Sequence, residues 1–373
     1  MKKGRIVLAS VLKPVDDSRS FEKIGQSLAG HGFEVFIIGK PSKKTSSGHQ
    51  NIKFLPLQKF DRLSLARFAA PIKIAQKIHQ VKPEVLIVNT HELLIVAIMN
   101  RIFFGTKIIY DIQENYWLNI LNTDAFPILI RPILATWVRL KEWLTSPLFN
   151  QYLLAEKGYE KEIRFIGKKY IVLANKVLIP TGFRRQTKQE KIRLLFSGTL
   201  AQSTGIFQAI DLTKKLHTVE PKIELLIIGF CALSKTLDKI KSSIQNSPFI
   251  TLLGGDQLVP HDEIMDAILH ADFGIISYPS SLHIENSIPT KLYEYLGCQL
   301  PVLLQDYNPW TEITEPYNAS VNLDFSNMDI DSILNQMKEA TFYKTQPSNV
   351  TWESEEPKLL QAINNIIIGQ RQL

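Results

Sequence analysis

Two apolar runs stand near the start of the sequence, Arg5-Ile-Val-Leu-Ala9 and Glu34-Val-Phe-Ile-Ile38, on either side of a segment with helical spacing, Phe21 to Ala29. Neither run alternates apolar with polar residues, which is typical of strands covered on both faces. Gly30-His31-Gly32 ends the helical segment before the second run. This stretch therefore predicts a βαβ unit, from which parallel α/β sheets are built.

The same alternation of helix and strand patterns continues along the chain. We predict helices at residues 65–81 and 93–103 and strands at 85–88 and 107–110 in the first half. After residue 180, strands are predicted at 193–196, 223–228, 250–253, 273–277 and 301–304, and helices at 207–217, 263–270 and 291–296. The polar stretch Thr181 to Lys191 separates the two series. We therefore expect an α/β protein with two doubly wound, Rossmann-like domains that face a cleft, residues 1–180 and 181–354.

The composition excludes several classes of protein. Of 373 residues, 45% are hydrophobic and 21% charged, which is ordinary for a globular chain. The two cysteines, Cys231 and Cys298, are too few for a disulfide scaffold or a Cys-rich zinc site. The apolar run after Met1 is too short for a signal peptide, and no stretch of about 20 residues is free of charge. We expect a cytoplasmic protein without a transmembrane helix.

The charge is unevenly distributed. Residues 1–180 contain 27 Lys and Arg against 14 Asp and Glu, whereas residues 181–373 contain 16 against 22. This basic first half predicts contact with an anionic surface, or else only a solvated basic face. Trp117, Trp137 and Trp143 lie near Arg131, Arg139 and Lys141, so they suit either a membrane interface or core packing. Nothing beyond the basic balance indicates nucleic-acid binding.

Common catalytic motifs are missing. Ser10-Val-Leu-Lys-Pro14 follows the first strand where a dinucleotide fingerprint G-x-G-x-x-G would stand, which counts against a nicotinamide or flavin dehydrogenase. The chain has no Walker A motif, no H-E-x-x-H and no G-x-S-x-G. The nearest D-x-D sequence, Asp329-Ile-Asp331, is expected at the start of a surface helix, so no metal site is predicted.

One segment has a clear physical logic, Asn286-Ser-Ile-Pro289-Thr-Lys291-Leu-Tyr-Glu294-Tyr-Leu-Gly297-Cys-Gln-Leu-Pro301-Val302. Pro289 suits the first turn of a helix, whose free N–H groups attract an anion such as a diphosphate. Lys291 adds a positive charge in that turn. Glu294 lies at i+3 on the same side, where its carboxylate would accept hydrogen bonds from ribose hydroxyls. The plain alternative is a surface Lys–Glu pair.

Four further segments accompany this one in the sequence. They are Asp17-Ser-Arg19 with Gly32-Phe-Glu-Val35, Tyr110-Asp111-Ile-Gln113-Glu114, Phe196-Ser-Gly198-Thr199-Leu200 with Gly205-Ile206, and Ala271-Asp272-Phe-Gly274. The segment from Pro289 to Val302 has the pattern P-x-K-x-x-E-Y-L-x-x-x-x-P-V. In this order, the five segments resemble the retaining GT-B glycosyltransferases, in particular glycosyltransferase family 4 (glycosyl transferase group 1).

The resemblance implies a metal-independent enzyme that moves a sugar from a nucleotide-sugar to an acceptor hydroxyl with retention. The nucleotide-sugar, UDP- or GDP-linked, would be a substrate, and no cofactor is implied. The first domain would bind the acceptor, with a C-terminal helix at about 355–373 packing back on it, and the second domain the donor. The basic first half suits a lipid-linked acceptor at the inner face of the cytoplasmic membrane, in surface polysaccharide or glycolipid assembly.

The resemblance also implies which residues form the site. Lys291, Glu294 and Gln113 would be catalytic. The donor would be held by Gly198, Thr199, Asn286, Ser287, Ile288, Thr290, Lys291 and Glu294, and the acceptor side would contain Asp17, Arg19 and Glu114. For Asp17 and Arg19 a local salt bridge that orders the first loop is an equal alternative, and Glu114 is as well explained by a role in its own loop.

The sequence departs from the family pattern at charged positions. Asn286 stands where the family has a Glu, Thr199 and Thr204 stand near its basic pair, and Gln113 replaces its His. The Gln113 amide is still able to hydrogen-bond a sugar hydroxyl. Two alternatives therefore stay open, a weakly active or non-catalytic family member and a nucleotide-sugar epimerase on the same fold. The missing His counts against the epimerase.

Overall fold

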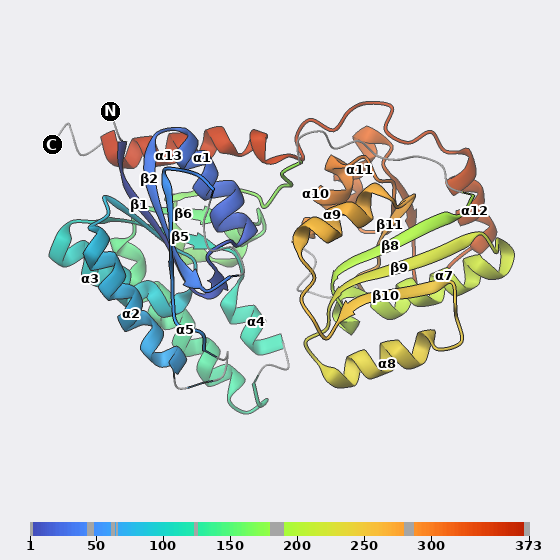
Figure 1. Ribbon diagram of the computed structural model, residues 1–373, viewed down its shortest axis with the longest axis horizontal. Helices are drawn as coiled ribbons and strands as arrows, with labels where there is room; N and C mark the ends of the chain where they lie inside the picture. Colours follow the sequence, from blue (N-terminus) through green and yellow to red (C-terminus); the bar gives the residue numbers. More distant parts are fainter. Residues whose placement is uncertain are drawn as a thin grey trace. The chain divides into compact units, whose positions relative to one another are not determined.

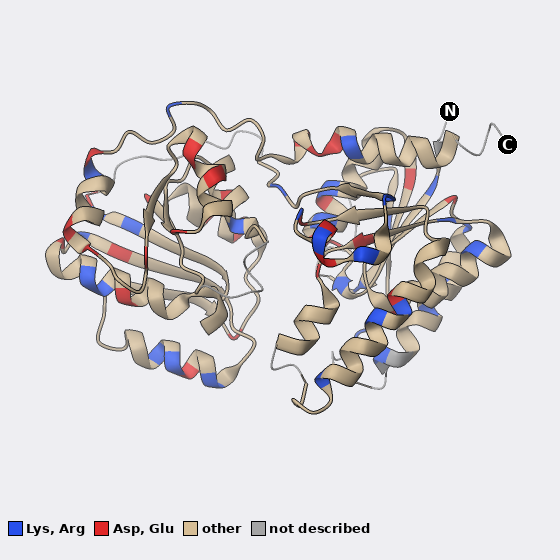
Figure 2. Cartoon of the chain, turned by 180° about the vertical axis from the view of Figure 1, so that it is seen from behind, with Lys and Arg blue, Asp and Glu red and all other residues tan. Residues whose placement is uncertain are grey.

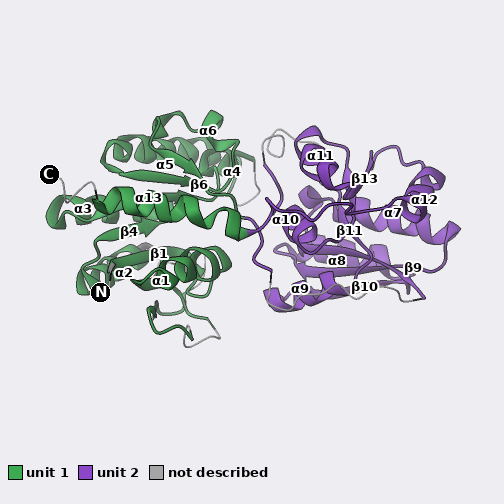
Figure 3. Ribbon diagram, turned by 90° about the horizontal axis from the view of Figure 1, so that it is seen from above, with its two compact units in different colours: residues 1–175, 352–373 green, residues 176–351 purple. Residues whose placement is uncertain are grey.

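The computed structural model describes residues 3–42, 48–60, 64, 66–122, 126–179, 190–279 and 287–368. The chain divides into two compact units, coloured in Figure 3. Unit 1 contains Met1–Asn175 and Trp352–Leu373, and unit 2 contains Lys176–Thr351. Of the expected linker Thr181 to Lys191, residues 181–189 lie outside the described residues.

Unit 1 is built on a seven-stranded parallel sheet with the order β3-β2-β1-β4-β5-β6-β7. Its strands are β1 (Lys3–Pro14), β2 (Phe33–Lys40), β3 (Ile52–Pro56), β4 (Val85–Val88), β5 (Lys107–Ile112), β6 (Gln151–Leu154) and β7 (Tyr170–Val172). The central strands are buried throughout, as their unbroken apolar runs predict. The strand order reverses between β1 and β4, so the carboxyl ends of these two strands mark the switch point where α/β sheets bind ligands.

Helices cover both faces of this sheet (Figure 1). A π-helical segment (Ser18–Gly25), N-capped by Asp17, leads into α1 (Gln26–Gly30), and α13 (Glu356–Ile368) packs beside it. The Trp352 Nε1–H donates to Ser27 Oγ at 2.9 Å, which fixes the returning C-terminal segment to unit 1. The other face carries α2 (Ala66–Val81), α3 (Leu94–Phe104) and α5 (Arg131–Thr145), while α4 (Tyr116–Asn122) and α6 (Tyr159–Glu162) are short.

Unit 2 has a six-stranded parallel sheet with the order β10-β9-β8-β11-β12-β13. Its strands are β8 (Ile192–Thr199), β9 (Ile223–Phe230), β10 (Ile250–Gly255), β11 (Phe273–Ile276), β12 (Val302–Gln305) and β13 (Ser320–Leu323). Its helices are α7 (Ile206–Val219), α8 (Ser234–Ile244), α9 (His261–Leu269), α10 (Thr290–Gly297), α11 (Asn308–Thr314) and α12 (Ile330–Glu339). The switch point here lies between β8 and β11. α10, which forms the central part of the Pro289 to Val302 pattern, lies between β11 and β12 in the chain.

The predicted elements are present within a few residues of their expected bounds, and the predicted α/β class with two parallel sheets is confirmed. The sequence patterns missed β3, β6, β7 and β13, which are three to five residues long. β3 and β7 lie at the edges of their sheet and are only partly buried, so they lack the continuous apolar run that identifies a central strand. Asp329-Ile-Asp331 does begin a helix, because the Asp329 side chain caps α12.

Candidate active site

Lys291 is a buried lysine whose ammonium group has no hydrogen-bond partner among the described residues. It sits in the first turn of α10 with 8% of its surface exposed. Its Nζ lies 4.7 Å from the ring centroid of Phe196 and 5.4 Å from that of Tyr278. Burial lowers the pKa of Lys291 to about 8, and the nearby Glu294 carboxylate acts in the opposite direction. The aromatic rings offset only part of the cost of burying this ammonium. An anionic ligand bound beside it would therefore be favourable.

Gly198, at the end of β8, makes room for this lysine. Its backbone is in the left-handed region, with φ of +96°, and a Cβ at this position would lie 2.6 Å from Lys291 Cε. The adjacent Thr199 is exposed, and its carbonyl accepts a hydrogen bond from Thr204 Oγ1 at 2.8 Å. The Thr204 hydroxyl also bonds the backbone of Ala201, so it stabilises its own loop. The structure thus brings Gly198 and Lys291 together, as the two predicted donor segments require.

Glu294 lies one turn after Lys291 on α10 and contacts His261 at the start of α9. Its Oε1 is 3.2 Å from His261 Nε2. The side chains of Glu294 and His261 are 13% and 39% exposed, so both are reached by solvent. His261 was not singled out in the sequence because a lone His in a polar stretch carries no pattern. The pair adds an acid and a titratable ring close to the buried ammonium.

The backbone that leads into α10 is held by Trp310. Its indole N–H donates to the Ser287 carbonyl at 2.8 Å, and its buried ring packs edge-on against Tyr278 and Tyr307. Ser287, Ile288 and Thr290 are all partly buried in this approach. Pro289 is the N-cap and gives no side-chain hydrogen bond, and its carbonyl accepts from the Leu292 N–H at 2.8 Å. Asn286 lies outside the described residues.

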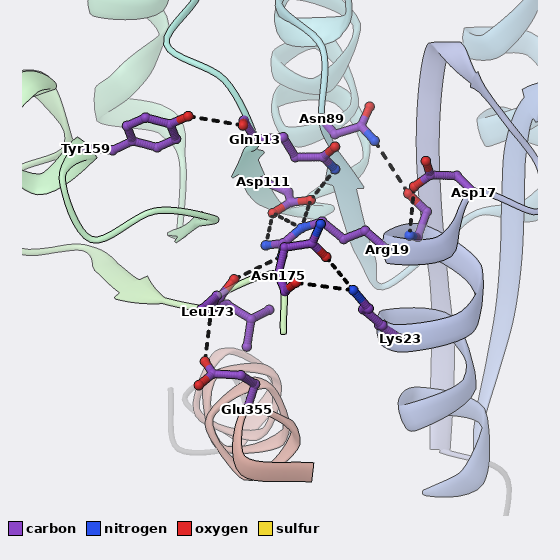
Figure 4. Close-up of polar contacts among 12 residues, drawn as sticks. Asp17, Arg19, Lys23, Asn89, Asp111, Gln113, Tyr159, Leu173, Asn175 and Glu355 are labelled. Atoms are coloured by element: carbon purple, nitrogen blue, oxygen red, sulfur yellow. Dashed lines mark hydrogen bonds and ion pairs between the residues drawn. The ribbon is translucent and has the colours of Figure 1, made fainter. Parts of the chain in front are cut away.

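In unit 1, Arg19 and Asp111 form a buried ion pair (Figure 4). Arg19 donates to both carboxylate oxygens from Nε, at 3.1 and 3.0 Å, and from Nη2 at 2.7 Å. Its Nη1 donates to the Leu173 carbonyl at 2.9 Å. Burial acts to lower the pKa of Arg19, but Asp111 outweighs it and the pKa is raised. Arg19 is only 3% exposed, so the structure places it as a support beneath the carboxyl ends of β1 and β5.

Gln113 is joined to this pair. Its Nε2 donates to Asp111 Oδ2 at 2.7 Å, and its backbone carbonyl accepts from the Tyr159 hydroxyl at 3.2 Å (Figure 4). Asp17 instead caps the π-helical segment, accepting from Ser20 N at 3.1 Å. Glu114 is exposed and accepts from Asn119 Nδ2 at 2.9 Å. Arg19 and Gln113 therefore share one carboxylate, whereas Asp17 and Glu114 contact their own loops.

A polar group at the end of β4 includes Asn89 and Thr90, which the sequence did not single out. Asn89 and Thr90 are buried, and Asn89 Oδ1 and Thr90 Oγ1 have no hydrogen-bond partner within the described part of the chain. Beside them, His91 Nδ1 lies 2.9 Å from Lys141 Nζ. Burial lowers the pKa of His91 to about 4, against the effect of Glu92. These groups lie at the switch point of the sheet, and the run Asn89-Thr-His-Glu92 after a buried strand was the available signal.

The described residues contain neither a metal-binding cluster nor a membrane-spanning helix. No group of three or more His, Cys, Asp or Glu side chains in these residues is arranged to hold a metal ion. No helix in the same residues is long and apolar enough to cross a membrane.

The second half of the chain resembles a known family. Residues 181–341 match the family model described as glycosyl transferases group 1. No curated protein matches the chain. The matched range contains Gly198, Thr199, His261, Lys291 and Glu294.

Solved structures of similar fold span the whole chain. Sucrose-phosphate synthase from Thermosynechococcus elongatus superposes with a TM-score of 0.74 at 12% identity, covering 98% of this chain and 100% of that one. Starch synthase IV from Arabidopsis thaliana, bound to ADP and acarbose, gives 0.69 at 10%, covering 98% and 100%. Anabaena HepE, in complex with UDP and glucose, gives 0.64 at 12%, covering all of both chains.

These matches define the fold. Two parallel-sheet α/β domains that superpose on solved glycosyltransferases over 98% of the chain are the GT-B fold. Residues 181–341 match the glycosyl transferases group 1 model, and three of the five segments lie in this range, so the resemblance to glycosyltransferases is confirmed there.

Proposed function

We propose that this protein is a retaining glycosyltransferase that moves a sugar from a nucleotide-sugar to an acceptor hydroxyl. The observation that carries the proposal is the buried Lys291 ammonium beside Gly198, which has no hydrogen-bond partner among the described residues and lies in the range that matches the group 1 model. When the bond between the anomeric carbon and the phosphate oxygen breaks, negative charge grows on the departing diphosphate. A fixed ammonium in a dry site stabilises that charge and lowers the barrier.

The donor is held, in this proposal, by the residues around Lys291. The first-turn N–H groups of α10 and the Lys291 ammonium bind the diphosphate. Glu294 accepts from the ribose hydroxyls, and Gly198 and Thr199 bring the β8 backbone close to the phosphates. Ser287, Ile288 and Thr290 contribute backbone, and Asn286 completes the segment. The complexes of the two neighbours with UDP and glucose and with ADP and acarbose support a nucleoside diphosphate sugar, and we propose UDP or GDP as its nucleotide.

Unit 1 is the proposed acceptor-binding domain. Asp111 holds the Gln113 Nε2, so the Oε1 of this amide is the end that accepts a hydrogen bond from a sugar hydroxyl. Asp17, Arg19 and Glu114 shape this side, with Arg19 acting through Asp111. No metal is needed in the proposed reaction, because the ammonium and the helix N-terminus supply the positive charge.

We further propose that the acceptor is lipid-linked and that the protein works at the cytoplasmic face of a membrane, in surface polysaccharide or glycolipid assembly. The excess of Lys and Arg in residues 1–180 supports this setting.

The test is donor binding followed by transfer. The melting temperature is measured with UDP, GDP and their sugar conjugates, with and without magnesium. We expect a metal-independent rise with one nucleotide series, and its loss in Lys291→Met. Lys235→Met, an exposed lysine on α8, is the matched control and should keep the rise. An equal rise in Lys291→Met would refute the site.

A non-catalytic sugar-binding protein is the second candidate. It is favoured by Thr204, whose hydroxyl is used within its own loop at a position near the family's basic pair. Transfer and hydrolysis are then assayed with the donor that gives the melting rise. Binding without any release of the nucleoside diphosphate, over a panel of lipid-linked and free sugar acceptors, would favour this candidate.

A further inference from the structure

The outer surface of α5 is apolar where a surface helix is normally polar. Its buried face is formed by Ala135, Val138, Glu142 and Thr145. The opposite face carries Ile133, Trp137, Leu140 and Leu144, spaced 4, 3 and 4 residues apart and each at least 43% exposed. Such spacing puts all four side chains on one stripe of the helix. Exposed Ile128, Leu129 and Ile130 extend this stripe into the preceding turn.

The neighbouring helix α3 also has an apolar outer face. Its exposed residues Ile95, Met99, Ile102 and Phe103 also lie on one face, and α3 packs directly beside α5. α2 adjoins α3 on its other side, where the rings of His79 and Phe104 are 5.2 Å apart. The three helices therefore form a continuous layer over one face of the sheet in unit 1, with a large apolar surface on the outside. We call this surface the α2–α3–α5 face. Isolated exposed apolar residues need no explanation, but a contiguous patch of this size indicates an interaction site.

The charged residues of these three helices are almost all basic, although Arg67 and Arg139 are ion-paired with Glu92 and Glu142. α2, α3 and α5 contain seven Lys and Arg residues and a single acidic residue, Glu142 (basic residues are blue in Figure 2). The Glu142 side chain is buried and is bonded by the Tyr110 hydroxyl at 3.0 Å. No acidic side chain of these three helices is exposed. A protein partner would have to supply acidic residues opposite these basic side chains. An anionic bilayer already offers a negative surface beside an apolar interior.

A hollow at the edge of the face is lined by both apolar and charged side chains. It has a volume of about 420 Å³ and lies between α4, α5 and the segment after α6. Its walls include Trp117, Leu140, Trp143 and Phe165, together with the charged residues Arg139, Arg164 and Glu162. Tryptophan beside arginine is the combination found at the boundary between lipid headgroups and acyl chains.

We propose that the α2–α3–α5 face is the surface by which this protein binds an anionic lipid bilayer. The apolar stripes enter the headgroup region, and the Lys and Arg side chains contact the lipid phosphates around them. The inference rests on the proposed function for its membrane setting. It does not depend on which sugar is transferred.

Vesicle co-sedimentation tests it with the full chain. Vesicles of neutral phosphatidylcholine alone are compared with vesicles that contain about a third phosphatidylserine. We expect binding to the anionic vesicles that weakens as salt rises. Trp137→Ser with Leu144→Ser should lower the partition coefficient about tenfold or more, because two large apolar side chains no longer enter the bilayer. Val219→Ser with Leu258→Ser, equally exposed apolar residues of unit 2, is the matched control and should bind like the unchanged protein.

The charges are tested in the same assay. Lys73→Gln with Lys77→Gln on α2 should weaken binding to anionic vesicles, whereas Lys235→Gln with Lys239→Gln on α8 should not. Equal loss in both lysine pairs, or equal loss in both apolar pairs, would overturn the assignment of the face. Binding to no vesicle would also overturn it. So would a dimer in light scattering that only Trp137→Ser with Leu144→Ser dissociates, because the face would then be covered by a second copy.

Failure of this inference is separable from failure of the proposed function. The melting rise with nucleotides is measured on the same variants without lipid. If the unchanged protein binds anionic vesicles through this face but no nucleotide raises its melting temperature, the proposed donor site fails and the docking surface stands. If nucleotides raise the melting temperature but the protein binds no vesicles, the docking surface fails and the proposed donor site stands.

Discussion

Gly198 and Lys291, 93 positions apart in the sequence, are packed so closely that a Cβ on the glycine would come within 2.6 Å of the lysine Cε. Gly198→Ala is expected to displace the Lys291 ammonium, because the end of this flexible side chain moves more easily than the backbone. The positive φ of Gly198 adds backbone strain of about 1 kcal/mol or more. We expect a small loss in the free energy of unfolding and a large loss of the nucleotide-induced melting rise.

Gly105 provides the control for that variant. It also has a positive φ, of +68°, but no atom lies within 4 Å of a Cβ built on it. Gly105→Ala should lose comparable stability to backbone strain while leaving nucleotide binding intact. If both alanine variants bind nucleotide equally well, the packing of Gly198 on Lys291 has no part in the donor site.

The lowered pKa of Lys291 predicts opposite pH dependences for stability and for donor binding. Between pH 8 and 10.5 the folded lysine has released a proton that the unfolded lysine still holds, so this group makes stability rise with pH. Diphosphate binding needs the ammonium, so affinity should fall as pH passes 8, by about tenfold per pH unit at most. Calorimetric titration from pH 7 to 9 measures this. A flat profile in the unchanged protein, matching Lys291→Met, would contradict it.

Breaking the buried pair of Arg19 and Asp111 should destabilise unit 1 strongly. Removing one partner leaves the other charge buried and uncompensated, at a cost of about 3–5 kcal/mol. We therefore expect a marked fall in the urea midpoint for Arg19→Met. Lys338→Met, which removes an exposed partner of Glu220, should leave the midpoint almost unchanged. An Arg19→Met protein as stable as this control would mean that the pair contributes nothing to folding.

The sequence predicted the parts of this molecule whose signal is local. Unbroken apolar runs such as Val85–Val88 identify central strands, because a strand that is buried on both faces has apolar side chains at consecutive positions. Lys291 and Glu294 were found because helix spacing and an N-terminal proline lie within one segment. The partner of Arg19 was not found, since Asp111 lies 92 residues away and nothing in a single sequence links the two.

For α5, the sequence did not show which side of the helix faces solvent. Trp137 and Trp143, close in the sequence to basic residues, suited either core packing or a membrane interface, and closeness in the sequence does not say which side of a helix faces the sheet. In the structure both tryptophans are exposed, at 58% and 59%, and small or polar residues face inward. The core-packing interpretation is therefore wrong for these two residues. The Asn89 and Thr90 group was missed for a related reason, because an unsatisfied polar atom becomes visible only when its surroundings are known.

Trp310 and Trp352 offer a matched test of how the donor segment is held. Both indoles are buried and both donate a hydrogen bond from Nε1, Trp310 to the Ser287 carbonyl and Trp352 to Ser27 Oγ. Replacing either by Phe removes one hydrogen bond and should cost about 1–3 kcal/mol of stability. Only Trp310→Phe releases the backbone that leads into α10, so only this variant should lose nucleotide affinity as well. Denaturation and nucleotide titration are measured on both variants. If the two lose stability alike and both keep full nucleotide affinity, the Ser287 segment does not need Trp310 to hold the donor.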